Sequence, residues 1–525
     1  MHMDLKQTVL GLELGSTRIK AVLLDDKLKP IASGSYEWEN QMVDGAWSYS
    51  MDDAISGMQA CYKELAANVL QQYNTPLTTV GAIGISGMMH GYLPFDSNGV
   101  QLAAFRTWRN TITPEASRQL SALFDFNIPQ RWSIAHLYQA MLNKEEHLPR
   151  IDYITTLAGY IHYLLTGERC VGLNEASGMF PINMKALDYD QAMMEKFHDL
   201  AAPYGFPWEL GSILPKALPA GVWAGELTPN GALLLDPTGA LQPGIPFAPP
   251  EGDMGTGMVS TNSVRVNTGN VSAGTSINAM MVIDKMPGAH KEIDIIATPD
   301  GFPAALVHCN SCTSDIDAWC GLFAEFAAAS DIEISKTQLY SILFNQALKG
   351  DIDCGDMVAF NYYSGEVISG LGEGRPLFVR KPDSKFNLAN FMRSHLFSAL
   401  ATLRIGMDIL TDTEGIKIEH LYGHGGFFKT PEVGQRMLSM AAKVPVSTME
   451  TAGEGGAYGM ALLAAYALWK EKNESLADFL QSKAFKDAIS TVLTATEQEQ
   501  AGFDAFLSRY KKALPIEQAA VEVLC

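Results

Sequence analysis

Two similar turns, nearly half the chain apart, constrain the fold most strongly. The first contains Gly15, Ser16 and Thr17 and is flanked by apolar segments at residues 9–12 and 19–24. The second spans residues 269–276, between apolar segments at residues 264–267 and 277–283. Apolar runs on both sides of a glycine-containing turn predict β-hairpins. Gly-Ser-Thr turns are common, so the repeat alone leaves coincidence open.

Both halves of the 525 residues also mix helical and extended patterns. We therefore expect two α/β domains of related topology that face each other across a cleft, at residues 1–262 and 263–525. The pattern predicts helices at 51–71, 391–410 and 453–469, a mostly helical segment at 114–165, strands at 80–85, 93–95 and 418–422, a tight glycine turn at 423–426, and irregular structure at 203–250.

Composition excludes several classes of protein. Hydrophobic residues make up 47% and charged residues 18%, which favours packed cores over disorder. The net charge of −20 argues against nucleic acid or an anionic membrane as a partner. We find no apolar run of about 18 residues and no signal-peptide pattern at the start, so we expect a cytoplasmic protein.

Seven cysteines in a chain of this size suggest a reducing compartment with free thiols. Cys309 and Cys312 form a CxxC pair, with Cys320 nearby. Because no second pair of Cys or His follows at ligand spacing, we expect buried structural thiols rather than a zinc site.

The glycine turns can bind phosphate, because their backbone N–H groups and hydroxyls are hydrogen-bond donors. The sequence contains neither the GxxxxGK[ST] pattern of a P-loop nor a GxGxxG dinucleotide fingerprint after a first strand. A carboxylate between glycines, Asp253, precedes the second hairpin. It could accept a proton from an attacking hydroxyl, or it could only bond its own turn.

Six segments in order carry a family resemblance. They are LELGSTRIKAVLLD from residue 12, GISGMMHGYLPFD from 84, EGDMGTGM from 251, VNTGNVSAGTS from 266, NYYSGEVISG from 361, and LYGHGGFFKTPEVGQ from 421 with GEGGAYGMALLA from 453. Together they resemble the FGGY carbohydrate kinases, most closely the xylulokinase and ribulokinase types. The resemblance spans about residues 9–468 and implies two ATPase domains of the actin/hexokinase-like (ribonuclease H-like) α/β fold flanking a central cleft.

The resemblance also implies site residues. Asp253 is the expected general base, and the expected sugar-binding residues are Met89, His90 and Arg109. ATP and Mg²⁺ are the expected cofactors, with Glu13 near the hydrated metal. The expected ATP-binding residues are Gly15, Ser16, Thr17, Lys20, Gly274, Thr275, Gly425 and Gly426.

Several positions depart from the family pattern. Glu13 replaces an Asp, Met254 replaces Asn or Gln, and Thr107 stands where the family has a sugar-binding Asp. Glu175, in a segment that resembles the one beside the sugar, also replaces an Asp. Phe427 and Phe428 replace small residues, either as a wall for adenine or as core.

We therefore expect an ATP-dependent kinase for a terminal hydroxyl of a ketopentose, xylulose or ribulose. The alternatives are a kinase for another ketose or polyol, a non-catalytic sugar or nucleotide sensor, and an actin- or chaperone-like ATPase. The expected partners are a small sugar and ATP, and a homodimer is compatible with the sequence.

Overall fold

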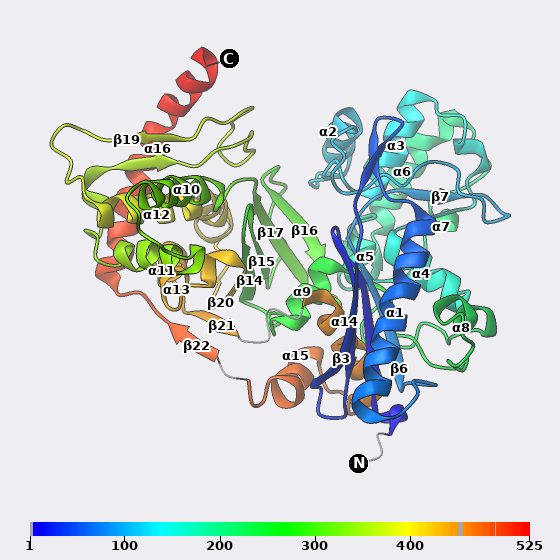
Figure 1. Cartoon of the computed structure of the whole chain (residues 1–525). Helices are drawn as coiled ribbons and strands as arrows, with labels where there is room; N and C mark the ends of the chain where they lie inside the picture. Colours follow the sequence, from blue (N-terminus) through cyan, green and yellow to red (C-terminus); the bar gives the residue numbers. More distant parts are fainter. Residues whose placement is uncertain (1–3, 450–454, 489, 525) are drawn as a thin grey trace. The chain divides into compact units, whose positions relative to one another are not determined.

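The computed structural model describes residues 4–449, 455–488 and 490–524. The chain divides into two compact units (Figure 1). Unit 1 contains Met1–Val264, Ile295–Ala304 and Glu454–Ala488, and unit 2 contains Arg265–Asp294, Ala305–Gly453 and Ile489–Cys525. The first long segment of unit 1 ends close to the expected boundary at residue 262, but residues 295–304 and 454–488 of the second half also belong to unit 1.

Unit 1 is built on a five-stranded sheet in the order β13-β6-β1-β2-β3. Strands β1 and β2 form the predicted hairpin, and β1 pairs with β6 in parallel. The five strands are β1 (Val9–Leu14), β2 (Arg18–Leu24), β3 (Pro30–Glu37), β6 (Ala82–Gly87) and β13 (Glu251–Gly252).

Two helices cover opposite faces of this sheet. Gly11 in β1 packs against the backbone of α14 (Gly455–Trp469), and Gly34 in β3 packs against the backbone of α1 (Met51–Tyr73). Gly11 is paired with Val22 and Gly34 with Ala21, which are neighbours in β2. Because adjacent residues of a strand point to opposite faces, the two helices lie on opposite sides.

The remaining elements of unit 1 are short. The helices are α2 (Pro114–Phe124), α3 (Ser133–Asn143), α4 (Leu157–Thr166), α5 (Leu173–Ser177), α6 (Gln191–Ala201), α7 (Leu210–Ile213), α8 (Pro229–Leu235), α9 (Asp253–Ser260) and α15 (Leu476–Phe479). The strands are β4 (Gln41–Val43), β5 (Ala46–Ser48), β7 (Leu93–Phe95), β8 (Tyr153–Thr155), β9 (Cys170–Gly172), β10 (Ile182–Asn183), β11 (Asp188–Tyr189) and β12 (Lys216–Leu218).

Unit 2 is built on a second sheet, of seven strands in the order β16-β17-β15-β14-β20-β21-β22. Its long helix α12 is buried along almost its whole length and forms the centre of this unit's helical layer. The strands are β14 (Thr268–Ala273), β15 (Ile277–Val282), β17 (Pro303–Cys309), β20 (His420–His424), β21 (Val446–Met449) and β22 (Ser490–Leu493), with β18 (Val358–Phe360) and β19 (Leu377–Val379) in a separate ribbon. The helices are α10 (Ser314–Ala329), α11 (Lys336–Ala347), α12 (Leu388–Asp408), α13 (Val433–Ala442) and α16 (Glu497–Val523). The chain passes between the units in β16 (Ile293–Ala297) and β17.

The internal repeat predicted from the two turns is confirmed. Strands β14 and β15 form an antiparallel hairpin, and β14 pairs with β20 in parallel. The order β20-β14-β15 therefore repeats the order β6-β1-β2. Each glycine turn joins the two strands of its hairpin.

The second hairpin differs in its boundaries from the prediction. Residues 269–273, which we expected in the turn, form most of β14, because Val271 is buried and the strand pairs on both sides. The turn is limited to 274–276. Short helices α7 and α8 interrupt the segment expected to be irregular, and Gly453, the expected start of the last predicted helix, lies outside the described residues.

The contact between α14 and α9 depends on Gly459. A Cβ at Gly459 would overlap the backbone carbonyl oxygen of Thr256, which cannot move without shifting α9. We predict that Gly459→Ala lowers the free energy of unfolding of unit 1 by about 2 kcal/mol, within the usual range for an overpacked core. Gly257→Ala is the matched control, because its Cβ would meet open space and alanine favours a helix. Urea unfolding of both variants checks this; equal stability would contradict the contact.

Candidate active site

The first candidate residue, Asp253, is held at the start of α9. Gly252 forms the N-cap, so Asp253 lies beside the unpaired N–H groups of the first helical turn. The Met89 N–H donates to Asp253 Oδ1 at 3.0 Å. Burial raises the pKa of Asp253 to about 6, and the N–H groups of Met89 and Met254 oppose that rise. The carboxylate can therefore exchange a proton near neutral pH.

Glu13 lies close enough to Asp253 for the charge of Asp253 to raise the pKa of Glu13. Its pKa is raised to about 7, first by burial and then by Asp253, while Lys20 and the backbone at Ala457 and Gly456 oppose the rise. The Ala457 N–H donates to Glu13 Oε2 at 3.2 Å, and Lys20 is its direct partner in the β1–β2 hairpin. The fold thus brings three of the sequence-predicted residues into one electrostatic cluster.

Two further buried carboxyl groups support the segment that carries Asp253. The Glu175 N–H donates to Glu251 Oε2 at 3.1 Å, and both side chains are almost fully buried. Burial raises the pKa of Glu251 to about 8 and that of Glu175 well above its usual value. The sequence analysis missed Glu251, although it stands two residues before Asp253.

Asn174 ties α5 to the same segment. Its Oδ1 accepts the Gly255 N–H at 2.9 Å, and its Nδ2 donates to the Ala297 carbonyl at 2.8 Å. Glu251 and Asn174 together attach α5 to the start of α9. This attachment fixes the backbone of Asp253, and it joins residues far apart in sequence.

The Met89-His90 segment follows β6 and is buried. Met89 is 2% and His90 1% exposed. His90 has a positive φ of 72°, and its ring stacks on Trp132 with 6.4 Å between ring centroids. Burial holds the pKa of His90 well below its usual value, so the imidazole is neutral. Its Nδ1 lies against the Gly178 backbone without hydrogen-bond geometry.

Arg109 lies with the first glycine turn. Ser16, Thr17 and Arg109 line one cavity of about 630 Å³. The Arg109 guanidinium donates to Asn40 Oδ1 at 3.2 Å and stacks on the Trp47 ring at 4.5 Å. Within the part of the chain that the structure describes, no hydrogen bond joins Arg109 to Met89, His90 or Asp253. The structure therefore groups Arg109 with the first glycine turn, and its predicted contact with the sugar stays a prediction.

Thr107 has a local structural role. It is fully buried, and its hydroxyl accepts the Arg109 N–H at 3.4 Å. Its own N–H donates to the Trp47 carbonyl at 3.2 Å. Thr107 therefore stabilises the turn that presents Arg109.

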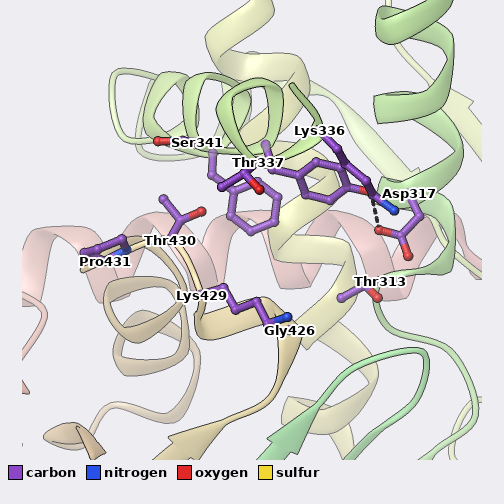
Figure 2. A pocket seen from close by; sticks show the side chains of 11 residues that line it. Thr313, Asp317, Lys336, Thr337, Ser341, Gly426, Lys429, Thr430 and Pro431 are labelled. Carbon is purple, nitrogen blue, oxygen red and sulfur yellow. Dashed lines mark hydrogen bonds between the residues drawn. The ribbon is translucent and has the colours of Figure 1, made fainter. Parts of the chain in front are cut away.

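Of the predicted nucleotide residues in unit 2, Gly426 lines a cavity, and Gly274 is linked to the lining of that cavity through Thr313. The Thr313 N–H donates to the Gly274 carbonyl at 3.0 Å, and the Cys312 N–H to the Thr275 carbonyl at 2.8 Å. Gly425 has a φ of 100°, and a Cβ there would overlap the Ala273 carbonyl oxygen. Thr313 and Gly426 both line the cavity, of about 520 Å³ (Figure 2).

Most of this cavity comes from residues that no sequence motif indicated. Helices α10 and α11 supply six of its lining residues, and Lys429, Thr430 and Pro431 follow the glycine turn at Gly426. Phe427 is buried and packs edge-on against Phe344 of the lining, so it belongs to the core behind the cavity. Phe428 packs at Gly423. The lining residues are Thr313, Asp317, Lys336, Thr337, Tyr340, Ser341, Phe344, Gly426, Lys429, Thr430 and Pro431.

Glu13 and Asp253 fit a magnesium ion in the chemistry of their donors. Carboxylate oxygens are the ligands that Mg²⁺ prefers, and it commonly binds through one or two of them plus water and phosphate. Burial is the first cause of the raised pKa of both groups, and Lys20 offsets part of the rise at Glu13. Among the described residues no group of three or more His, Cys, Asp or Glu is arranged to hold a metal.

Two further expectations concern cysteines and membranes. Cys309, Cys312 and Cys320 are buried free thiols, as predicted, and burial raises the pKa of each. No helix in the described ranges is both long and apolar enough to cross a membrane.

The raised pKa of Glu13 predicts a pH-dependent stability. A carboxyl group whose pKa rises on folding stabilises the fold fully below its unfolded pKa of 4.5, and this contribution is lost as the pH rises through 7. Glu13→Gln removes the penalty, so the variant should gain about 1–2 kcal/mol over the wild type between pH 5 and pH 8.

Urea unfolding at pH 5, 6, 7 and 8 measures this difference. Glu195→Gln, which removes an exposed carboxylate of α6, controls for the change in net charge. A pH-independent difference between Glu13→Gln and wild type would show that Glu13 is not under electrostatic stress.

The chain is similar to known kinases. A xylulose kinase of Haemophilus influenzae is 23% identical over 478 residues, which cover 87% of this chain and 90% of that protein. An autoinducer-2 kinase of Salmonella typhimurium is 22% identical over 286 residues, 52% of this chain and 51% of that protein. The crystal structure of a xylulose kinase from Rhodospirillum rubrum matches with a TM-score of 0.78 at 17% identity, covering 97% of this chain and 100% of that chain.

The structural match confirms the predicted two-domain α/β kinase fold. Two family descriptions fit the sequence: the N-terminal domain of the FGGY family of carbohydrate kinases over residues 8–259, and the C-terminal domain of the same family over residues 269–468. These ranges include all the motifs that carried the resemblance except the first three residues, 266–268, of the segment VNTGNVSAGTS. The chain belongs to the FGGY family of carbohydrate kinases and is a phosphotransferase with an alcohol group as acceptor.

Proposed function

We propose that the protein transfers the γ-phosphate of ATP to a terminal hydroxyl of a ketopentose, xylulose or ribulose, with Asp253 as general base. The observation that carries this proposal is the setting of Asp253, a carboxylate at a helix start with a pKa of about 6 and one oxygen bonded to the Met89 N–H. Each carboxylate oxygen can accept more than one hydrogen bond, so the group keeps the capacity to take the proton of the acceptor. We assign acceptor binding to residues 1–262 and adenosine binding to residues 263–525.

The proton transfer accompanies phosphoryl transfer. The hydroxyl oxygen of the sugar attacks the γ-phosphorus, its proton passes to Asp253, and the bond from phosphorus to the bridging oxygen of ADP breaks. A positioned base contributes about 10²–10⁴-fold to such a step. The Met89 N–H orients the carboxylate, and the attachment of α5 through Glu251 and Asn174 holds the backbone of Asp253 in place.

Charge around the phosphates is the second requirement. Lys20, Ser16 and Thr17 supply donors in unit 1, and Thr275 supplies donors in unit 2. The N–H groups of Gly15 and Gly274 donate to the Arg18 and Ser276 carbonyls and so close the two turns. A bound Mg²⁺ held near Glu13 and Asp253 would neutralise negative charge on the transferred group. A side chain on Gly274 would meet open space in the protein alone, so this glycine leaves room next to the backbone donors.

The adenosine assignment rests on the cavity of unit 2. The 520 Å³ cavity lies within the size range of small-molecule sites and combines hydroxyl, cationic and aromatic groups. It adjoins both Gly274, through Thr313, and Gly426. Gly425 must stay a glycine for this arrangement, because its φ and its approach to Ala273 exclude a side chain.

The ketopentose assignment rests on Met89 and His90 and on the xylulose kinase relatives. A neutral His90 can donate or accept a hydrogen bond to a sugar hydroxyl. The relatives also include an autoinducer-2 kinase and a glycerol kinase, which keep another ketose or a polyol as the alternative. Thr107 and Met254, which replace sugar-binding residues of the family pattern, also leave that alternative open.

The test of the base is Asp253→Asn. We predict that the variant binds ADP within a few-fold of wild type but turns over roughly 10²-fold more slowly or worse. Wild-type kcat/KM should rise with pH through about 6, because the base acts when deprotonated, and should then level off. ADP release with xylulose and ribulose measures both effects.

Asp236→Asn is the matched control for the loss of a buried carboxylate in unit 1. The Asp236 carboxylate accepts the Leu241 N–H at 2.9 Å within its own loop, so turnover should stay near wild type. If Asp253→Asn keeps more than half of the wild-type turnover, Asp253 is not the base.

A further inference from the structure

We propose that Asp317 selects ribonucleotides, by accepting hydrogen bonds from the ribose hydroxyls of the bound nucleotide. The proposal rests on the assignment of the unit 2 cavity to ATP and deepens it, because it names the group that recognises the nucleoside. Asp317 belongs to no motif that the sequence analysis found, and it lines the cavity from α10.

The position of Asp317 along α10 relates it to the phosphate turn. Thr313 immediately precedes α10, and its N–H donates to the Gly274 carbonyl in that turn. The Asp317 N–H donates to the Thr313 carbonyl at 2.8 Å, so Asp317 is one helical turn further on. Four residues of helix rise about 6 Å, which suits the step from a phosphate to the ribose of the same nucleotide.

The carboxylate of Asp317 is oriented by a neighbour on α11. The Tyr340 hydroxyl donates to Asp317 Oδ1 at 2.7 Å, shown as the dashed line in Figure 2. This bond leaves the second oxygen of the exposed carboxylate as an acceptor at the cavity. A carboxylate cannot face phosphates without repulsion, so it must meet the hydrogen-bond donors of the nucleoside.

The other residues of the cavity lining indicate which part of the nucleotide lies beside Asp317. Thr430 and Pro431 lie across the cavity from Asp317 in Figure 2, and Phe344 adds an aromatic ring to the lining. These groups offer apolar surface to a purine, whereas Asp317 offers only acceptors. Lys336 and Lys429, also in the lining, supply positive charge for phosphate. The ribose diol is therefore the partner that suits Asp317.

Direct binding of nucleoside diphosphates tests the inference without a sugar acceptor. We expect wild type to bind ADP about tenfold more tightly than 2′-deoxy-ADP or 3′-deoxy-ADP, or both, because a charged hydrogen bond is lost. Asp317→Ala should bring these ratios close to one, mainly by weakening ADP. Tyr340→Phe should reduce them partially, since the carboxylate loses its fixed orientation.

Glu325→Ala is the matched control. Glu325 is an exposed carboxylate on the same helix, α10, and does not line the cavity. Its ratios should equal those of wild type. Asp317→Asn, which keeps the shape of the side chain, guards against a loss of folding and should lower the ratios as well.

The outcomes separate the two proposals. If wild type binds ADP and both deoxy analogues equally, or if Asp317→Ala leaves the ratios unchanged, the inference is overturned while the nucleotide site stands. If Asp317→Ala changes the ADP/GDP ratio instead, the residue contacts the base and the inference is again wrong. If wild type binds no adenine nucleotide, the assignment of the cavity fails together with the inference.

Discussion

The structure depends on holding two carboxylates, Glu13 and Asp253, near each other at the edge of a core. Burial opposes the ionisation of both groups, and the charge of Asp253 adds to this effect at Glu13, so that their pKa values rise to about 6 for Asp253 and about 7 for Glu13. The N–H groups of Met89 and Met254 offset part of the rise at Asp253, and the Ala457 N–H and Lys20 offset part of it at Glu13. A site under such stress favours any cation that binds there.

This arrangement explains why residues 455–488, which are distant from the rest of unit 1 in sequence, belong to unit 1. The N–H of Ala457 reaches Glu13 because α14 packs directly on β1 and α9, at glycines where any side chain would overlap backbone. Helix α14 is apolar on almost every side, so it needs burial on every side. The contact of Glu13 with Ala457 therefore depends on the glycines that let α14 pack closely within unit 1.

The same hairpin and parallel strand serve different purposes in the two units. In unit 1 the hairpin β1–β2 carries Glu13 and Lys20 next to Asp253, the proposed base. In unit 2 the hairpin β14–β15 is linked through Thr313 to the start of α10 and so to the cavity that we propose for the nucleotide. Repetition of the topology thus provides two glycine turns, each with different helices around it.

Local patterns predicted what depends on neighbours in sequence. The hairpin at Gly15, the helix after residue 51 and the position of Asp253 between glycines could all be read from short motifs. The glycines led us to predict a turn where β14 begins. Gly269 instead lies in the strand, because pairing with the strands on both sides determines its backbone conformation. The contact of Glu251 with α5 and the pair formed by Asp317 and Tyr340 could not be predicted, since each joins separate elements through a single side chain.

Acceptor-dependent formation of ADP tests the proposed carbohydrate phosphorylation most directly. Purified protein with ATP and Mg²⁺ should be screened against D- and L-xylulose, D- and L-ribulose, a ketohexose, glycerol and other polyols, with the phosphorylated product identified by mass and ³¹P NMR. We expect one ketopentose to stimulate ADP formation well above the acceptor-free rate and to yield a phosphate ester on its terminal hydroxyl. If none of these alcohols stimulates ADP formation although the protein binds ATP, the proposed carbohydrate phosphorylation is contradicted.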